Sequence, residues 1–187
     1  MTDYQINNLT PTIGAEISGI DLSKDLNSQN LDNIYKNLIE HKVIFFRNQN
    51  LKPEDHIAFA KSFGDIEPPH PIYPHVENFP EITLLENDPS NPPDTDEWHT
   101  DVTFKTKPPF TSILYSKEIP PSGGDTLWWV HSSASYRRIC SRRVGSSSGV
   151  VALTSRKKRC ARSLRAIAPS NQWTQSKGAY FKRETRA

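Results

Sequence analysis

Apolar residues between positions 28 and 39 recur with the spacing of an α-helix. They stand at intervals i, i+3, i+4, i+7 and i+8: Leu31, Ile34, Tyr35, Leu38 and Ile39. Asn27 and Ser28 come just before them, and these residue types favour the N-cap of a helix. The spacing predicts an amphipathic helix. A second helix is expected from Pro53 to Gly64, with its buried face formed by Ile57, Ala60 and Phe63.

Short apolar, β-branched runs bounded by turn residues predict the strands. These runs lie within residues 10–22 and at 43–46, 82–85, 98–104, 111–115 and 125–130. Between Glu67 and Pro80, five prolines predict an extended loop without regular structure. Loops of this kind often carry function. The pattern alone predicts a mixed, mostly β domain.

The pattern fails after Trp129, and the composition changes there as well. Residues 130–187 contain 14 Lys and Arg but one acidic residue, a net charge of +13, whereas residues 1–129 have a net charge of −11. Ser, Arg and Lys separate the apolar clusters at 144–153 and 164–168. Such a segment buries too little to offset its ordering entropy, so we expect a disordered basic tail over 130–187 after a domain at 1–129.

Candidate chemistry is concentrated in residues 97–104, where an imidazole and a carboxylate stand two positions apart. On a strand, the side chains of His99 and Asp101 share a face. They supply two of the three ligands of the 2-His-1-carboxylate facial triad, which holds non-heme Fe(II). The tripeptide H-x-D also arises by chance, and a solvated His-Asp turn pair is the alternative on spacing alone.

The wider pattern resembles the taurine dioxygenase (TauD/TfdA-like) family of Fe(II)- and 2-oxoglutarate-dependent oxygenases. The similar motifs occur in order: IGAEISGIDL at 13–22, VIFFR at 43–47, HPIYPH at 70–75, PPDTDEWHTDVTF at 92–104, PP at 108–109 and GGDTLW at 123–128. The resemblance covers about residues 4–129. It implies a mostly β (α+β) fold, a partial double-stranded β-helix (jelly roll) with two N-terminal helices.

The resemblance also implies the chemistry. His99 and Asp101 would hold Fe(II), and Thr126 would help to hold the co-substrate 2-oxoglutarate. In the substrate pocket would lie three further residues: His70, Tyr73 and Val102. The family hydroxylates carbon beside a sulfonate such as taurine, using O₂ and releasing sulfite and an aldehyde. The cofactor performs the oxidation, so no residue of this chain is assigned as a catalytic acid, base or nucleophile.

Local evidence leaves alternatives open at two of these positions. Thr126 also suits a β-branched residue that fills a strand, and His70 also suits a surface histidine in a Pro-rich loop. Thr95 departs from the asparagine common in taurine-specific relatives, which leaves the substrate open.

The family's second ligating histidine and its binding arginines have no counterpart in this sequence. The last histidine is His131, and no arginine after it stands in a matching motif. We therefore expect a truncated or frameshifted form with little activity. Strands 43–46, 82–85 and 111–115 would then lack some of their partners, which predicts aggregation.

A rival hypothesis is a non-catalytic protein that binds nucleic acid or another polyanion through the basic tail. The tail's aromatic residues are too few and irregular for regular base stacking, which disfavours nucleic acid as the partner. Cys140 and Cys160 form neither a disulfide framework nor a zinc motif. The sequence has neither a signal peptide nor an apolar run of membrane-spanning length, so we expect a cytoplasmic protein, and a homo-oligomer is compatible with it.

Overall fold

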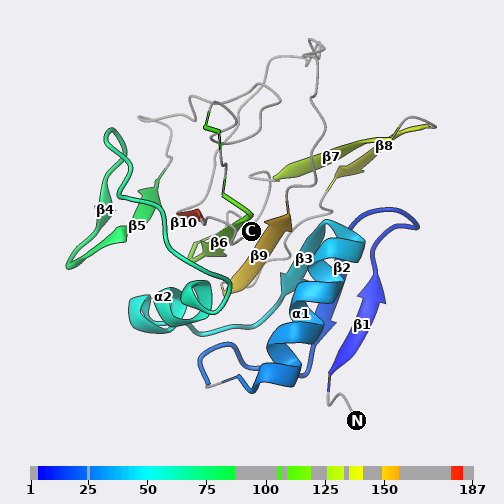
Figure 1. The fold of residues 1–187 in the computed structure, drawn as a ribbon, viewed down its shortest axis with the longest axis horizontal. Helices are drawn as coiled ribbons and strands as arrows, with labels where there is room; N and C mark the ends of the chain where they lie inside the picture. Colours follow the sequence, from blue (N-terminus) through cyan, green and yellow to red (C-terminus); the bar gives the residue numbers. More distant parts are fainter. Residues whose placement is uncertain are drawn as a thin grey trace.

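The structure is a computed structural model, which describes residues 4–24, 26–86, 105–106, 109–118, 126–132, 135–140, 149–155 and 178–182 (Figure 1). The elements are α1 (Ser28–His41), α2 (Pro53–Lys61), β1 (Gln5–Asn8), β2 (Ala15–Ser18), β3 (Val43–Phe46), β4 (His75–Val76), β5 (Phe79–Leu85), β6 (Thr111–Ser116), β7 (Leu127–Ser132), β8 (Ser135–Cys140), β9 (Val150–Ser155) and β10 (Gly178–Lys182). Neither helix is long and apolar enough to cross a membrane.

Both predicted helices are confirmed. Helix α1 begins at its expected cap, because the side-chain oxygen of Asn27 accepts a hydrogen bond of 2.8 Å from the backbone N–H of Asn30. Helix α2 begins at Pro53, and the Asp55 carboxylate accepts a hydrogen bond of 3.0 Å from the Lys52 N–H. Each helix turns most of its apolar side chains toward the sheet. Leu38 of α1 is fully buried there, whereas Tyr35 of the predicted apolar face is exposed.

The strands form an eight-stranded sheet and a separate two-stranded ribbon. The order in the large sheet is β1-β2-β3-β9-β6-β10-β5-β4, and β7 pairs with β8 in the ribbon. Strands β2 and β3 are parallel, and all other described pairs are antiparallel. The expected mostly β fold with two N-terminal helices is thus confirmed.

Strand β9 shows that the expected disorder of the tail is wrong for residues 150–155. Val150–Ser155 lies between β3 and β6 in the middle of the large sheet, paired to both (Figure 1). Its side chains alternate between the two faces. Val151 and Leu153 join the cluster under the helices, whereas Val150 and Ala152 join a second cluster with Phe45 and Trp128. The basic composition of the tail gave no sign that this short apolar run forms a strand. Pairing with β3 and β6 buries the run in the core.

The strands expected to lack some of their partners each have a neighbour on both sides. Strand β3 lies between β2 and β9, β6 lies between β9 and β10, and β5 lies between β10 and β4. The sequence analysis also missed β1, β4, β8 and β10. Strand β4 and the start of β5 lie inside the loop predicted at 67–80. Pro80 is tolerated there because neither β4 nor β10 pairs with it in the described registers. The strand predicted at 98–104 lies outside the described residues.

Gly149, the residue before β9, is hydrogen-bonded to the turn after β3 and to the end of β6. Its N–H donates to the Ser116 carbonyl at 2.9 Å, and its carbonyl accepts from the Gln49 N–H at 2.7 Å. Its φ of +88° is in the region that favours glycine. A Cβ at this position would lie 2.1 Å from the Gln49 carbonyl oxygen, which is backbone and cannot move aside.

Replacing Gly149 with alanine is therefore expected to destabilise the protein by about 2–4 kcal/mol, because backbone strain adds to the steric clash. Urea unfolding monitored by circular dichroism measures the change. As a control, Ile72→Ala removes a side chain that is 82% exposed and should alter stability by less than about 0.5 kcal/mol. Equal stability of Gly149→Ala and the unmodified chain would show that residue 149 is not docked in this way.

Candidate functional site

The structure describes three of the six predicted site residues. His70 and Tyr73 lie in the loop between α2 and β4, and both are half-buried. Thr126 is exposed and directly precedes β7. His99, Asp101 and Val102 lie outside the described residues. Of the three described site residues, His70 and Tyr73 are in contact with each other.

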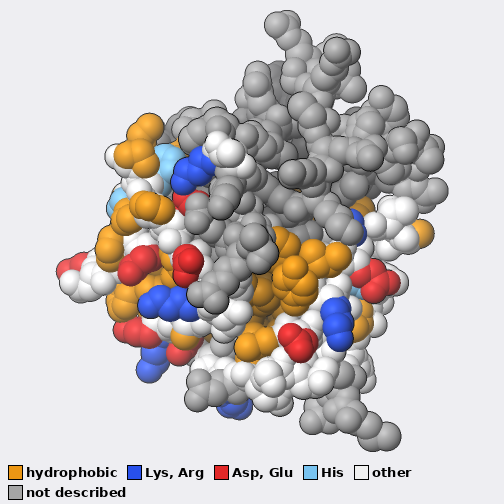
Figure 2. Space-filling view, in the orientation of Figure 1, with side chains coloured by type: hydrophobic (Ala, Val, Ile, Leu, Met, Phe, Trp, Pro, Cys, Tyr) orange, Lys and Arg blue, Asp and Glu red, His pale blue; other side chains and the backbone are white. Residues whose placement is uncertain are grey.

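His70 closes a small turn in this loop. Its Nδ1 atom accepts hydrogen bonds from the backbone N–H groups of Ile72 and Tyr73, both at 3.3 Å. The His70 and Tyr73 rings lie against each other, with centroids 4.6 Å apart and planes inclined by 37°. Figure 2 shows histidine side chains at the surface near the β4 end of the sheet. The loop therefore presents an imidazole whose position is fixed by its own backbone.

An ion pair connects the start of this loop to the segment that carries the H-x-D motif. The Lys105 ammonium group contacts Glu67 Oε2, and the Glu67 side chain is 10% exposed. The other oxygen, Oε1, is buried and has no hydrogen-bond partner among the residues that the structure describes. Lys105 follows Asp101 by four residues, and Glu67 precedes His70 by three. Sequence reasoning missed this pair because 38 residues separate its members and no local pattern marks it.

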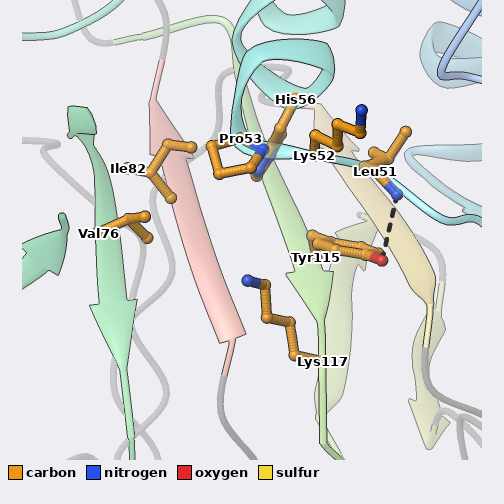
Figure 3. A pocket seen from close by; sticks show the side chains of 8 residues that line it. All are labelled: Leu51, Lys52, Pro53, His56, Val76, Ile82, Tyr115 and Lys117. Atoms are coloured by element: carbon orange, nitrogen blue, oxygen red, sulfur yellow. Dashed lines mark hydrogen bonds between the residues drawn. The ribbon is translucent and has the colours of Figure 1, made fainter. Parts of the chain in front are cut away.

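Among the described residues, His56 is a deeply buried titratable group that belongs to no predicted site. It lies on the buried face of α2 beside a cavity of about 10 Å³, lined by Leu51, Lys52, Pro53, His56, Val76, Ile82, Tyr115 and Lys117 (Figure 3). The Tyr115 hydroxyl accepts from the Leu51 N–H and donates to the Gln49 carbonyl, both at 3.2 Å. This cavity has room for about one water molecule, so it is part of the core and not a substrate site.

Burial lowers the pKa of His56 to about 4, opposed by its hydrogen bond to the Ile113 backbone and assisted by the Lys117 charge. Above pH 6.5 the imidazole is neutral in both folded and unfolded chains. Below that pH the unfolded chain takes up the proton first, so we expect stability to fall by about 3 kcal/mol between pH 6.5 and 4. Urea unfolding across this range measures the slope. In His56→Gln the slope of the unfolding free energy against pH should decrease by the equivalent of one proton. An unchanged slope would show that His56 does not cause this pH dependence.

A shallow hollow of about 400 Å³ lies on the surface beside β2 and the turn after β3. The Arg47 guanidinium in it is paired with the Glu16 carboxylate, and both side chains are partly buried. The Gln49 side chain closes one wall by donating to the Ile20 carbonyl at 3.1 Å and accepting from the Leu22 N–H at 2.9 Å. These bonds hold residues 20–22 in place, and none of the three described site residues lines this hollow.

Comparison with known protein families gives a match over residues 5–143 to the family described as taurine catabolism dioxygenase TauD, TfdA. The chain belongs to this family. The match includes His70, Tyr73, His99, Asp101, Val102 and Thr126, and it runs past Trp129.

Two curated relatives from this family have high identity to the chain. An alpha-ketoglutarate-dependent sulfate ester dioxygenase of Pseudomonas putida is 40% identical over 139 residues, which are 73% of this chain and 44% of that protein. An alkylsulfatase of Acinetobacter baylyi is 43% identical over 125 residues, which are 66% of this chain and 38% of that protein. The chain therefore spans less than half the length of these relatives.

Solved structures agree on the fold. A taurine dioxygenase from Burkholderia xenovorans superposes with a TM-score of 0.71 at 22% identity, covering 98% of this chain and 90% of that one. The crystal structure of AAD-2 in complex with Mn(II) and N-oxalylglycine gives a TM-score of 0.54 at 23% identity, covering 67% of this chain and 50% of that one. At these identities the likeness concerns the fold alone, and it agrees with the jelly-roll expectation.

Proposed function

We propose that residues 5–143 belong to an Fe(II)- and 2-oxoglutarate-dependent dioxygenase that acts on a small sulfate ester or sulfonate. The observation that carries this proposal is the family match, because it spans 74% of the chain as one continuous stretch and contains the H-x-D motif. The relatives named for sulfate esters support the substrate class.

The donor chemistry of His99 and Asp101 fits a ferrous ion. A neutral imidazole nitrogen and a carboxylate oxygen are the ligand types of the facial triad. In the part of the chain that the structure describes, no group of three or more His, Cys, Asp or Glu could hold a metal ion, so that part offers no competing site. Iron with 2-oxoglutarate supplies the oxidising chemistry when bound.

The remaining proposed residues bind and orient. The Thr126 hydroxyl, exposed at the start of β7, donates to a carboxylate of 2-oxoglutarate. His70 donates to an oxygen of the anionic head group, while Tyr73 and Val102 form walls that exclude water. A sulfate ester and a sulfonate present the same tetrahedral monoanion to these groups. Thr95, where taurine-specific relatives carry asparagine, favours a substrate other than taurine.

We expect the 187-residue chain to bind metal but to release succinate from 2-oxoglutarate very slowly or not at all. It supplies two named ligands, and an anionic co-substrate without a bidentate arginine lacks a pair worth about 1.5–3 kcal/mol. Binding of Mn(II), measured by calorimetry with and without 2-oxoglutarate, tests the proposed function independently of turnover. One Mn(II) per chain, bound more tightly with 2-oxoglutarate, supports it, and no binding contradicts it. Robust succinate release that requires Fe(II) and taurine or ethyl sulfate would contradict the expected low activity.

A further inference from the structure

The turn at residues 70–73 determines which imidazole nitrogen of His70 carries the proton. Two backbone N–H groups, those of Ile72 and Tyr73, point at Nδ1 from 3.3 Å. A nitrogen that accepts hydrogen bonds must offer its lone pair, so Nδ1 cannot carry a proton in this geometry. The proton of the neutral ring is then on Nε2.

We propose that the loop holds His70 as a neutral Nε2–H donor before any ligand binds, and that Tyr73 is the residue that positions it. The role of this donor toward an anionic sulfate or sulfonate oxygen rests on the proposed function. The tautomer and its cause do not, because they follow from contacts within the loop.

Tyr73 acts on His70 in two ways. Its backbone N–H is one of the two donors to Nδ1, and its ring packs on the imidazole with a centroid separation of 4.6 Å. The hydrogen bonds fix the position of Nδ1, and the ring contact restricts rotation about the Cβ–Cγ bond. A ring flip would bring Cδ2 toward the two N–H groups and remove both hydrogen bonds. Together the contacts keep Nε2 on the side of the ring away from the turn.

The other tautomer would place three hydrogen-bond donors next to one another with no acceptor among them. With the proton on Nδ1, the N–H of the ring would face the N–H groups of Ile72 and Tyr73, and Nε2 would become an acceptor. An acceptor repels an anionic oxygen, whereas the Nε2–H donor attracts it. The turn therefore selects, of the two neutral tautomers of His70, the one whose Nε2–H can donate to an anionic oxygen. Pre-organisation of this kind improves affinity because the ligand does not have to order the group that binds it.

Nuclear magnetic resonance of the full 187-residue chain, labelled with ¹⁵N-histidine, tests the proposal without any need for activity. The His70 signals are assigned by their loss in His70→Gln. At a pH where the ring is neutral, we expect an unprotonated Nδ1 and a protonated Nε2. A protonated Nδ1, or signals averaged between the two tautomers, would overturn the proposal.

Matched variants separate the ring of Tyr73 from its hydroxyl. Tyr73→Phe keeps the ring and should keep the single tautomer, while Tyr73→Leu should give averaged signals. Ile72→Ala is the control, because the exposed side chain is removed and the backbone N–H is retained. Averaging in Ile72→Ala but not in Tyr73→Leu would overturn the role of Tyr73. A second, uniformly ¹⁵N-labelled sample of each variant, with unchanged β6 and β9 amide signals, establishes that the fold is intact.

Titration with ethyl sulfate tests the anion role. We expect the Nε2–H signal to shift with no change at Nδ1, and affinity to fall by about tenfold in Tyr73→Leu, which is the loss of one hydrogen bond to a charged group. A single tautomer with no response to ethyl sulfate would overturn the donor role. Failure of the proposed function is detected separately, by the absence of Mn(II) binding to the same chain.

Discussion

A chain in which Leu153 is replaced by aspartate is expected to lose its cooperative unfolding transition. Leu153 is fully buried in β9, where it packs in the cluster that the two helices cover. Removing its side chain alone costs about 2–5 kcal/mol, and a carboxylate without a partner in the same place costs more. Since small domains have only about 5–15 kcal/mol of stability in total, this change removes most or all of it.

Thermal unfolding followed by circular dichroism measures this effect, with Leu153→Ala as the graded variant that stays folded at reduced stability. Ile72→Asp is the matched control, because it makes a similar exchange at an exposed position and should leave the midpoint unchanged. A Leu153→Asp chain that unfolds as cooperatively as the unmodified chain would show that the domain folds without β9. That outcome would agree with the disordered tail that the composition predicts.

Replacing His99 with alanine is expected to weaken metal binding by about 100-fold or more, and Asp101→Ala should do the same. Substitutions that only disturb the support of a ligand already cost about 10–100-fold, and here a ligand itself is lost from a set of two. Calorimetric titration with Mn(II) in the presence of 2-oxoglutarate measures the affinities.

His41→Gln is the control for these two variants. His41 is the last residue of α1 and belongs to no predicted site, so its replacement should leave the affinity for Mn(II) unchanged. Metal binding that survives in both His99→Ala and Asp101→Ala would place the ion elsewhere in the chain.

The elements that could be predicted are those whose signal is local. The cap at Asn27, the spacing of α1, Pro53 at the start of α2 and the apolar run of β3 each lie within a few consecutive residues. Strand β9 could not be predicted in the same way. Its four apolar residues carry no distinctive local signal. They form a strand because they pair with both β3 and β6, which are formed by residues far earlier in the chain.

The candidate site shows the same division. His70 and Tyr73 were identified from the motif at 70–75, and the structure brings their rings into contact. The motif does not reveal that the backbone of the turn binds Nδ1, because that depends on loop conformation. Nor does it reveal the pair between Glu67 and Lys105, which joins two segments distant in sequence. Local patterns identified residue types, whereas their partners depended on the fold.

The central claim is that this TauD-family chain holds its metal on His99 and Asp101, and paramagnetic broadening tests it most directly. Mn(II) is added below stoichiometry to the ¹⁵N-histidine-labelled chain with 2-oxoglutarate, and the six histidine signals are followed. We predict that the His99 signal broadens first, that His41 and the buried His56 stay sharp, and that Asp101→Ala abolishes the selective loss. Broadening that begins at another histidine, or equal broadening of all six, would contradict the claim.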